Sequence, residues 1–318
     1  MIWYKYVTPS GHYFSPFSKS KTTLKSYDSP LALAEDMNKL DYSYNVITNN
    51  LVEVYEKTVA DSDPIDLPCG VYSHEHPTSS SPERLTPLET RPDTYIELLT
   101  SLSNLDQSID QFINSKDLYD SSKTLYKLGV LLFGPPGTGK TSYMREFIRK
   151  HPDSIIIFLD GIPSRKFIEK IETSTKDQLK IFVFEEVVSL LEDSTEIRQM
   201  LDFLDGSKSI SNSIYFMSTN YPESIPENVI RNGRIDVFVK VEYPDSDART
   251  RLINLYLKRN PLQEELLCTQ NMPIVDIREI CFLHKKTSKT FEECARIVEE
   301  KNKMIRKHFG KTTEIKLT

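Results

Sequence analysis

Short apolar runs recur along the chain from residue 127 onward, with helical patterns between them. The runs have the length of buried strands, and they occupy 128–133, 155–159, 181–184, 214–217 and 235–241. A strand that is apolar throughout is buried on both faces, which is typical of a parallel sheet covered by helices. The pattern therefore predicts an α/β fold with a parallel sheet flanked by helices.

Helical periodicity is found on both sides of this region. Before it, apolar residues at steps of three and four would line one face of a helix that packs on another element. These residues are Leu98, Leu102, Leu105, Ile109 and Phe112. After Pro244 the pattern is wholly helical, and TFEE, with Thr290 and Glu293, predicts a capping box at the start of the last helix.

The first part of the chain has a mixed pattern. Residues 1–57 combine aromatic-rich, strand-like pieces with one helical stretch at Leu31–Leu40, which predicts a small α+β module. Residues 58–92 contain several prolines among Ser, Thr and Asp, a composition that resists regular structure and predicts a linker. The chain then divides into this N-terminal module, the linker, an α/β domain at 93–245 and a helical domain at 246–318.

The composition is that of a globular protein with a slightly acidic balance. Apolar residues make up 38% of the chain, enough to form cores, and the formal net charge is −6. Such a chain has no overall attraction for nucleic acid or for an anionic membrane surface. Residues 246–318 are locally basic, with 15 Lys and Arg against 10 Asp and Glu. We favour a solvated helical face there over a contact with an acidic partner.

The cysteines and the apolar runs indicate a compartment. Cys69, Cys268, Cys281 and Cys294 form no C-x-x-C pair and no metal-finger spacing, so we interpret them as reduced structural thiols. The start of the chain has no secretory or mitochondrial pattern, and the apolar runs are too short to cross a bilayer. We expect a cytoplasmic protein without a membrane partner.

The apolar run that ends at Phe133 is followed by GPPGTGKT, a complete G-x-x-x-x-G-K-T motif between a predicted strand and a predicted helix. The glycines let backbone N–H groups approach a β-phosphate, and the helix adds its positive end. Lys140 would contact the β- and γ-phosphates, and the Thr141 hydroxyl would ligate Mg²⁺. We favour this site, with ATP and Mg²⁺ as cofactors, over a glycine-rich structural turn. Its predicted residues are Gly134, Pro135, Pro136, Gly137, Thr138, Gly139, Lys140, Thr141 and Ser142.

Two acidic residues follow the third apolar run, in IFVFEE. Successive strand residues point to opposite faces, so Glu185 and Glu186 can act differently at the carboxyl edge of the sheet, where ligands of open α/β folds bind. ATP hydrolysis needs a negative group near the magnesium and one near the attacking water. We assign Glu185 to the metal and Glu186 to the water, against the alternative of an ordinary acidic loop.

A polar side chain and two arginines complete the predicted catalytic set. The run SIYFMSTN ends at Asn220, whose amide could hold the same water or the γ-phosphate. In IRNGRID, Arg231 and Arg234 lie three residues apart. Alone, such a pair indicates surface charge, but an arginine supplied by a neighbouring subunit can stabilise a transferring phosphoryl group. Because the pair follows the other motifs in order, we predict the catalytic role.

Together, GPPGTGKT, IFVFEE, FMSTN and IRNGRID resemble the AAA clade of the AAA+ ATPases, over residues 93–310. The resemblance implies a P-loop AAA+ module with a helical lid, in a homo-oligomeric ring (hexamer or heptamer) where Arg231 and Arg234 reach the neighbouring nucleotide. Within the clade, the stretch IDQFINSKDLYDSSKTLYKLGVLLFGPPGTGKTSY is similar to the mitochondrial translocase of the folded Rieske iron–sulfur protein. It implies neither that cargo nor that organelle.

The chain departs from the clade in two places. The clade usually has Asp where this chain has Glu185, so the longer side chain must reach the same magnesium water or hydrolysis slows. Many protein-threading relatives carry an aromatic pore-loop residue after the second strand, where this chain offers only Phe167, in DGIPSRKFIEKI. Phe167 and Ile171 are four residues apart, and we favour the buried face of a helix.

Three functions fit these observations. A ring ATPase could remodel or translocate a protein partner recognised by residues 1–57, with the linker giving that module reach, and we favour this function. A nucleic-acid motor or loader is supported only by the basic lid, because the sequence has no added DNA-binding motif. A nucleotide-gated scaffold would follow if Glu185 blunts hydrolysis.

Overall fold

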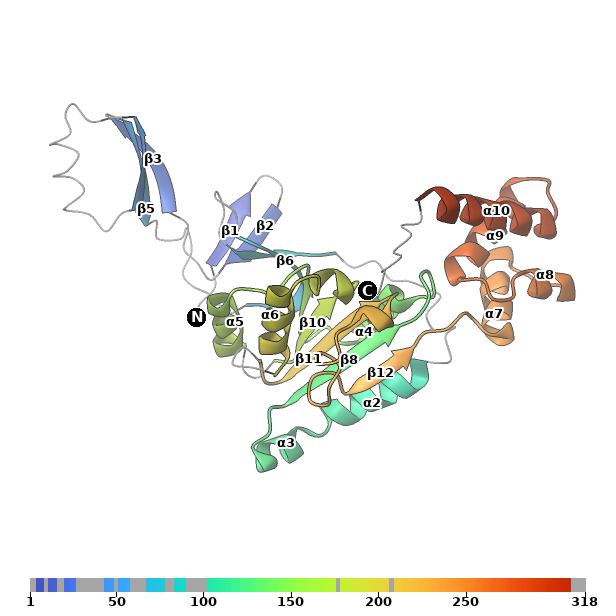
Figure 1. Cartoon of the computed structure of the whole chain (residues 1–318), viewed down its shortest axis with the longest axis horizontal. Helices are drawn as coiled ribbons and strands as arrows, with labels where there is room; N and C mark the ends of the chain where they lie inside the picture. The colour runs from blue at the N-terminus through green and yellow to red at the C-terminus, as the bar shows by residue number, and fades with distance from the viewer. Residues whose placement is uncertain are drawn as a thin grey trace, which may run out of the picture.

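The computed structural model of the chain describes residues 67–77, 83–89, 102–175, 178–205 and 209–309. It also describes the backbone of five strands nearer the N-terminus (Figure 1): β1 (Tyr4–Thr8), β2 (Gly11–Ser15), β3 (Ser20–Ser26), β4 (Ser43–Thr48) and β5 (Leu51–Lys57). The helix predicted at Leu31–Leu40 lies outside the described residues.

A nine-stranded sheet forms the centre of the fold (Figure 1), with the order β1-β2-β7-β6-β9-β10-β11-β8-β12. Its other strands are β6 (Gly70–Glu75), β7 (Arg84–Pro87), β8 (Lys127–Phe133), β9 (Ile155–Leu159), β10 (Lys180–Phe184), β11 (Ser213–Thr219) and β12 (Val237–Lys240). All neighbours from β6 to β12 pair in parallel, which confirms the predicted parallel sheet. β1, β2 and β7 add an antiparallel edge.

The predicted boundaries at the N-terminal end need correction. β1 and β2 belong to the large sheet, whereas β3, β5 and β4 form a separate sheet, so residues 1–57 are divided between two sheets. The linker at 58–92 is wrong in its central part, because β6 and β7 form a hairpin that pairs with β9. Tyr72 and Leu85 of this hairpin are buried. Pro87 ends β7, a position where proline disturbs the ladder least, so proline content did not exclude strands here.

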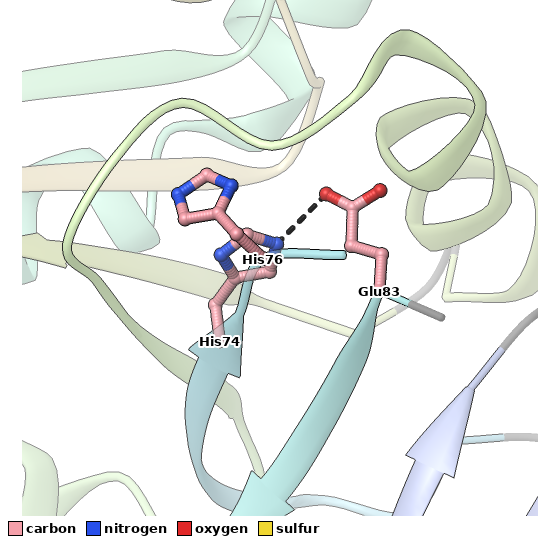
Figure 2. A group of neighbouring side chains, drawn as sticks. All are labelled: His74, His76 and Glu83. Carbon is pink, nitrogen blue, oxygen red and sulfur yellow. Dashed lines mark hydrogen bonds and ion pairs between the residues drawn. The ribbon is translucent and has the colours of Figure 1, made fainter. Parts of the chain in front are cut away.

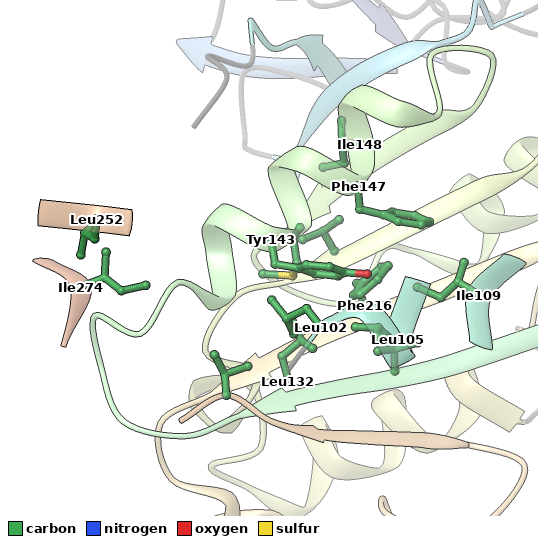
Figure 3. Close-up of a cluster of buried hydrophobic side chains, with 14 of the residues drawn as sticks. Leu102, Leu105, Ile109, Leu132, Tyr143, Phe147, Ile148, Phe216, Leu252 and Ile274 are labelled. Atoms are coloured by element: carbon green, nitrogen blue, oxygen red, sulfur yellow. The ribbon is translucent and has the colours of Figure 1, made fainter. Parts of the chain in front are cut away.

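Each face of the sheet is covered by its own helices. The helices of this part are α2 (Ser103–Ile113), α3 (Lys116–Ser122), α4 (Lys140–Lys150), α5 (Arg165–Ser174) and α6 (Ser194–Asp205), with short 3₁₀ turns η3 (Val187–Leu190) and η4 (Pro222–Ser224). On one face, α2 and α4 share a core with strand residues such as Val130 and Phe216 (Figure 3). On the other, α5 and α6 share a core with Leu131 and Tyr215. Because strand side chains alternate between faces, the continuous apolar runs fill both cores.

Helix α2 is the amphipathic helix that the sequence predicts. Its apolar positions from Leu102 to Phe112 are buried in the same core as α4 (Figure 3), while Leu98 lies outside the described residues. The hydroxyl of Tyr143 on α4 donates a hydrogen bond of 2.5 Å to Asp106 on α2. Burial, together with this carboxylate, raises the pKa of Tyr143. The phenol therefore stays protonated and holds the two helices together.

The described chain after Pro244 forms four helices, as predicted, at one end of the sheet (Figure 1). They are α7 (Ser246–Leu257), α8 (Gln263–Cys268), α9 (Ile274–Lys286) and α10 (Phe291–Phe309). The predicted capping box is confirmed, because the Thr290 N–H donates to Glu293 at 2.7 Å and the Glu293 N–H donates to the Thr290 hydroxyl at 3.2 Å. We call these four helices the lid.

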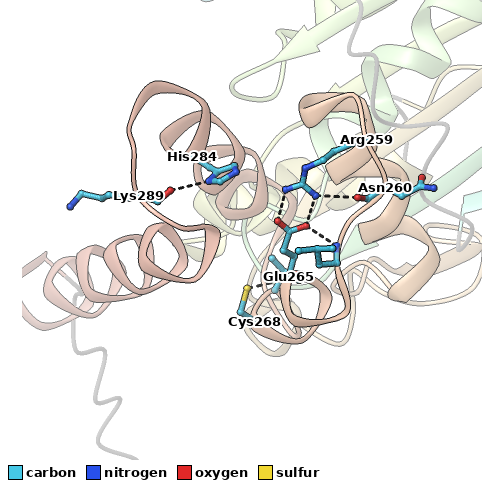
Figure 4. Close-up of polar contacts among 8 residues, drawn as sticks. Arg259, Asn260, Glu265, Cys268, His284 and Lys289 are labelled. Carbon is cyan, nitrogen blue, oxygen red and sulfur yellow. Dashed lines mark hydrogen bonds and ion pairs between the residues drawn. The ribbon is translucent and has the colours of Figure 1, made fainter.

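A charged pair fixes the connection between α7 and α8 in the lid (Figure 4). Arg259 donates hydrogen bonds of 2.8 and 2.5 Å to the two carboxylate oxygens of Glu265, a buried residue. The Leu262 N–H donates to the same carboxylate at 2.8 Å. The hydrogen bonds from Arg259 lower the pKa of Glu265 against the opposing effect of burial. The carboxylate therefore stays charged and holds the turn in one conformation.

Two further features concern the cysteines and the helices of the described chain. The four cysteines are free, and burial raises the pKa of the Cys281 thiol to about 12, so this thiol stays protonated inside the lid. In the part of the chain that the structure describes, no helix combines the length and the apolar character that a bilayer crossing requires.

Gly129 of β8 lies against the segment that carries the two arginines. A Cβ atom at this position would lie 1.8 Å from the carbonyl oxygen of Arg234 and 2.9 Å from the Cα atom of Ile235. The Gly129 N–H donates to the Asp236 carboxylate at 2.8 Å, and the Asp236 N–H donates to the Gly129 carbonyl at 2.8 Å. Two backbones in contact leave no room for a side chain. The glycine at position 129 therefore allows the backbone of residues 234–236 to pack in direct contact with β8.

We expect Gly129→Ala to lower the free energy of unfolding by about 3 kcal/mol or more, the upper end of overpacking effects, because the two backbones must separate. The matched control is Gly233→Ala in the same segment. Gly233 has a φ of 83° and open space around its Cβ position, so its substitution costs only the left-handed backbone, about 1–2 kcal/mol. Chemical denaturation measures both variants, and an equal loss in the two would contradict the contact.

Candidate nucleotide-binding site

The predicted phosphate loop connects β8 to α4 at the carboxyl edge of the sheet. Gly134, Gly137 and Gly139 have φ values of 143°, 74° and 104°, conformations that favour glycine. Helix α4 begins directly after Gly139, a residue with no side chain to cap it. The first N–H groups of α4 and the positive end of the helix dipole are therefore available to an anion.

The Lys140 side chain lies back across this loop. Its ammonium donates hydrogen bonds to the carbonyl oxygens of Gly134 at 2.8 Å and Pro135 at 2.9 Å, and to the amide oxygen of Asn220 at 2.6 Å. Lys140 is 6% exposed, and this burial lowers the pKa of the ammonium, with Glu186 acting in the opposite direction. Its hydrogen-bond partners are neutral oxygens, so a phosphate would be a better partner for the buried cation than the loop itself.

Glu186 lies beside Asn220. One carboxylate oxygen of Glu186 accepts from the Asn220 side-chain amide, and the other accepts from the Asn220 backbone N–H at 3.3 Å. The Glu186 N–H donates to the Ser218 hydroxyl at 3.4 Å. Glu186 has a φ of 51°, a left-handed turn directly after β10 that accompanies these contacts with β11. Lys140, Asn220 and Glu186 thus form a continuous hydrogen-bonded chain across the ends of β8, β10 and β11.

A cavity of about 210 Å³ opens beside this hydrogen-bonded chain. The predicted residues that line it are Pro136, Gly137, Gly139, Lys140, Thr141, Ser142, Glu186 and Asn220. The other predicted loop residues do not line the cavity but make hydrogen bonds within the loop. They are Gly134, Pro135 and Thr138. Gly134 and Pro135 accept from Lys140, and the Thr138 hydroxyl donates to the Pro135 carbonyl at 2.8 Å. The contiguous motif therefore folds into one wall of a single cavity.

Three lining residues escape the sequence analysis: Ser218, Ile274 and Val275. Ser218 stands inside FMSTN, so the motif itself contained the signal. Ile274 and Val275 begin α9 of the lid, and nothing in their local sequence marks them. They contact the phosphate loop closely, since a Cβ atom on Gly137 would lie 2.5 Å from a methyl carbon of Val275. The lid therefore forms part of the cavity wall.

Both adjacent glutamates lie in the turn after β10, and only one of them, Glu186, lines the cavity. Glu185 is exposed and is not among the residues that line the cavity. Its assignment as a magnesium ligand stays a prediction.

The two arginines lie outside the cavity of their own chain. Arg231 is exposed. Arg234 is half-buried, donates to the Asn228 carbonyl and lies 3.6 Å from the Asp205 carboxylate. Neither arginine lines the cavity, so a catalytic role for them requires a second subunit and stays a prediction.

Phe167 lies on α5 and is fully buried, as is Ile171. Both belong to the core between α5 and the sheet. The interpretation as the buried face of a helix is therefore confirmed, and Phe167 is not a surface aromatic residue.

Comparison with known proteins agrees with this geometry. Residues 130–243 match the family AAA, described as "ATPase family associated with various cellular activities". This matched region is similar to an AAA domain and contains the phosphate loop, Glu186, Asn220 and both arginines. The helices that follow it, including Ile274 and Val275, lie beyond the matched residues.

Several curated proteins are similar to the chain. An uncharacterised AAA domain-containing protein of Schizosaccharomyces pombe is 26% identical over 77% of this chain and 37% of its own length. A proteasome-activating nucleotidase of Methanococcus maripaludis is 24% identical over 61% of this chain and 55% of its own length. An "AAA ATPase forming ring-shaped complexes" of Corynebacterium diphtheriae is 28% identical over 54% of this chain and 41% of its own length. The chain thus spans about half or less of the length of these relatives.

We expect Lys140→Ala to weaken ATP binding about 10- to 150-fold, because one charge-assisted contact to phosphate contributes about 1.5–3 kcal/mol. Lys150→Ala is the matched control, since Lys150 is an exposed residue on the same helix. Its ammonium lies 3.4 Å from the Asp106 carboxylate. Titration with a fluorescent ATP analogue gives both affinities. Equal affinities for the two variants would exclude Lys140 from the phosphate site.

Proposed function

We propose that the protein binds ATP with Mg²⁺ in this cavity, hydrolyses it, and works as a homo-oligomeric ring that remodels or translocates a protein partner. The observation that carries the proposal is the hydrogen-bonded chain of Lys140, Asn220 and Glu186 beside the N-terminus of α4. In this arrangement one cavity is lined by a cation that can bind phosphates, Lys140, and by a carboxylate that can bind the attacking water, Glu186. The match to the AAA family and the relatives named as ATPases support the same conclusion.

Each residue of the cavity has its own proposed role in hydrolysis. The loop N–H groups and Lys140 bind the β- and γ-phosphates, and Lys140 exchanges its carbonyl hydrogen bonds for them. Asn220 holds the carboxylate of Glu186 in place through two hydrogen bonds. Glu186 orients a water molecule for in-line attack and accepts its proton.

Thr141 and Glu185 are the proposed magnesium ligands. Hydroxyl and carboxylate oxygens are the donors that Mg²⁺ prefers, and the ion keeps several of its waters, so these residues suit it. Thr141 lines the cavity next to Lys140. Glu185 lies outside the cavity lining, and we propose that it acts through a bound water. When bound, the ion would neutralise charge on the phosphates.

We expect Glu186→Gln to bind ATP with nearly unchanged affinity but to reduce kcat by about 10²- to 10⁴-fold, the usual contribution of a general base. The amide can still accept from Asn220 but cannot take a proton. Glu192→Gln, at an exposed position after η3, is the control and should keep full turnover. A phosphate-release assay measures both. If the native protein itself shows no magnesium-dependent turnover, the nucleotide-gated scaffold becomes the better description.

We further propose that Arg231 and Arg234 act on the nucleotide of the neighbouring subunit. In one chain they lie outside the cavity, and a relative is named for its ring-shaped complexes. The subunit number, hexamer or heptamer, belongs to this proposal.

Arg234→Ala should retain ATP binding but lose about 10³- to 10⁵-fold in kcat, the effect of removing an arginine that stabilises a phosphoryl transition state. The control Arg296→Ala, an exposed lid position paired with Glu292, should stay active. Mixing Arg234→Ala with Glu186→Gln subunits should restore part of the activity, because some shared sites then contain both groups. Complete inactivity of the mixture, with rings intact by mass photometry, would argue against a shared site.

We propose the protein partner on two grounds. It rests on relatives named as proteasome-activating nucleotidases and on the strands before residue 58 as a recognition module. The similarity to the Rieske-protein translocase type suggests how the core is built, without its cargo. The free cysteines are compatible with the cytoplasm. Stimulation of turnover by DNA or RNA that falls steeply with salt would instead favour the nucleic-acid motor.

A further inference from the structure

Three potential metal-binding side chains meet on the β6–β7 hairpin (Figure 2), and none of them lines the nucleotide cavity. They are His74, His76 and Glu83, and one ligand atom from each lies within 4.8 Å of those of the other two. His74 lies in β6, and His76 follows the end of that strand two positions later. Glu75 pairs with Arg84 across the hairpin, so His76 and Glu83 are the residues next to the last pair of the ladder. The end of the hairpin therefore brings the three residues together.

The two inner residues are buried and the third opens to solvent. His74 and Glu83 are 1% and 2% exposed, and His74 Nε2 lies 2.8 Å from Glu83 Oε1. The other ring nitrogen of His74, Nδ1, is buried with no hydrogen-bond partner among the described residues. Nε2 is the nitrogen that lies beside Glu83, so it is the ring atom that would bind an ion shared with that carboxylate.

A fourth potential ligand, the Asp160 carboxylate, lies next to this cluster. Asp160 follows β9, the parallel neighbour of β6, and its carboxylate lies 3.5 Å from His76 Nε2. The next residue, Gly161, leaves the space that His76 occupies, since a Cβ atom there would lie 2.4 Å from His76 Nε2. Asp160 is exposed and can rotate toward the histidines. The set of two imidazoles and two carboxylates is then complete.

We propose that His74, His76 and Glu83, with Asp160 as fourth ligand, bind a divalent transition-metal ion, with Zn²⁺ as the best fit. Imidazole nitrogens suit zinc and its neighbours in the first transition row, whereas magnesium and calcium prefer oxygen ligands alone. Two ligands on tetrahedral zinc, each about 2.1 Å from the ion, lie about 3.4 Å apart. The pair of His74 and Glu83 has to widen by only roughly 0.6 Å to admit the ion.

The ionisation states agree with metal binding. Burial disfavours the charged form of Glu83, but hydrogen bonds from His74 and Ser164 outweigh it and lower its pKa. Burial lowers the pKa of His76 as well. A carboxylate and a neutral imidazole are the forms that bind a metal.

The proposed ion would join two parts of the fold. Glu83 accepts hydrogen bonds from the N–H of Ser164, at 2.8 Å, and from its hydroxyl, and Ser164 caps the N-terminus of α5. His74 also makes an edge contact with Phe167 of α5, at 5.1 Å between ring centroids. Strand β7 of the hairpin also pairs with β2. The metal would thus fasten the antiparallel edge of the sheet to α5 and to the segment after β9.

Zinc binding by the full chain tests the proposal. After treatment with a chelator, the wild-type protein should take up one Zn²⁺ per chain in competition with a chromogenic chelator, with micromolar or tighter affinity. His76→Ala should weaken binding by more than the roughly 10- to 100-fold that loss of an outer-shell partner costs. His308→Ala, an exposed histidine on α10, is the matched control and should bind as the wild type does.

Further variants separate this site from other metal ligands. Cys69→Ser and Glu186→Gln should leave the stoichiometry unchanged, because neither the exposed thiol nor the nucleotide cavity is involved. Co²⁺ should give the visible bands of nitrogen and oxygen ligands without a thiolate charge-transfer band. If His76→Ala unfolds, Asp160→Asn at an exposed position should still weaken binding measurably. Absence of binding by the wild type, or equal affinity in His76→Ala and His308→Ala, would overturn the proposal.

Discussion

The contact between the Lys140 ammonium and the Asn220 amide, 2.6 Å long, is the interaction on which the candidate site depends. Lys140 begins a helix after β8, and Asn220 follows β11, the strand paired with β8. Asn220 in turn holds Glu186, which follows β10. Parallel strands end at the same edge of a sheet. Three segments far apart in sequence therefore deliver a cation, an amide and a carboxylate to one cavity.

The lid gives the same cavity a second wall. Ile274 and Val275 line it together with the phosphate loop, and the absence of a side chain at Gly137 lets α9 approach that loop. Apolar residues beside a phosphate site reduce the access of water, which strengthens charge interactions there. The Arg259–Glu265 pair and the capping box make the lid a defined body, so its contact with the loop joins two ordered parts.

The antiparallel edge of the sheet is built by different rules. The hairpin β6–β7 is short, flanked by prolines and rich in polar residues, yet it buries Tyr72 and Leu85 against the central strands. His74 and Glu83 occupy positions there that apolar residues usually fill. Their burial is stabilised by hydrogen bonds to each other and to Ser164. Buried polar side chains at such positions usually have a structural or functional role. The proposed metal site would give His74 and Glu83 such a role.

Much of this arrangement could be predicted from the sequence. The parallel sheet follows from apolar runs whose side chains fill two cores. The loop between β8 and α4 follows from GPPGTGKT, because its glycines and the strand and helix beside it are consecutive in the sequence. The buried position of Phe167 follows from its spacing to Ile171. These features depend on neighbours within one segment, and a contiguous pattern encodes such neighbours directly.

Other features appear only when segments far apart become neighbours. The composition of residues 58–92 concealed a hairpin, since prolines beside a strand and prolines in a linker look alike in sequence. Val275 reaches the loop through the packing of the lid, and Glu83 meets His74 at the end of the hairpin. By itself the sequence determined the strands of the central parallel sheet, the helices of the lid and the loop on which we propose phosphate binding. Tertiary structure decided which side chains meet, because pairing and packing bring together groups that no local pattern connects.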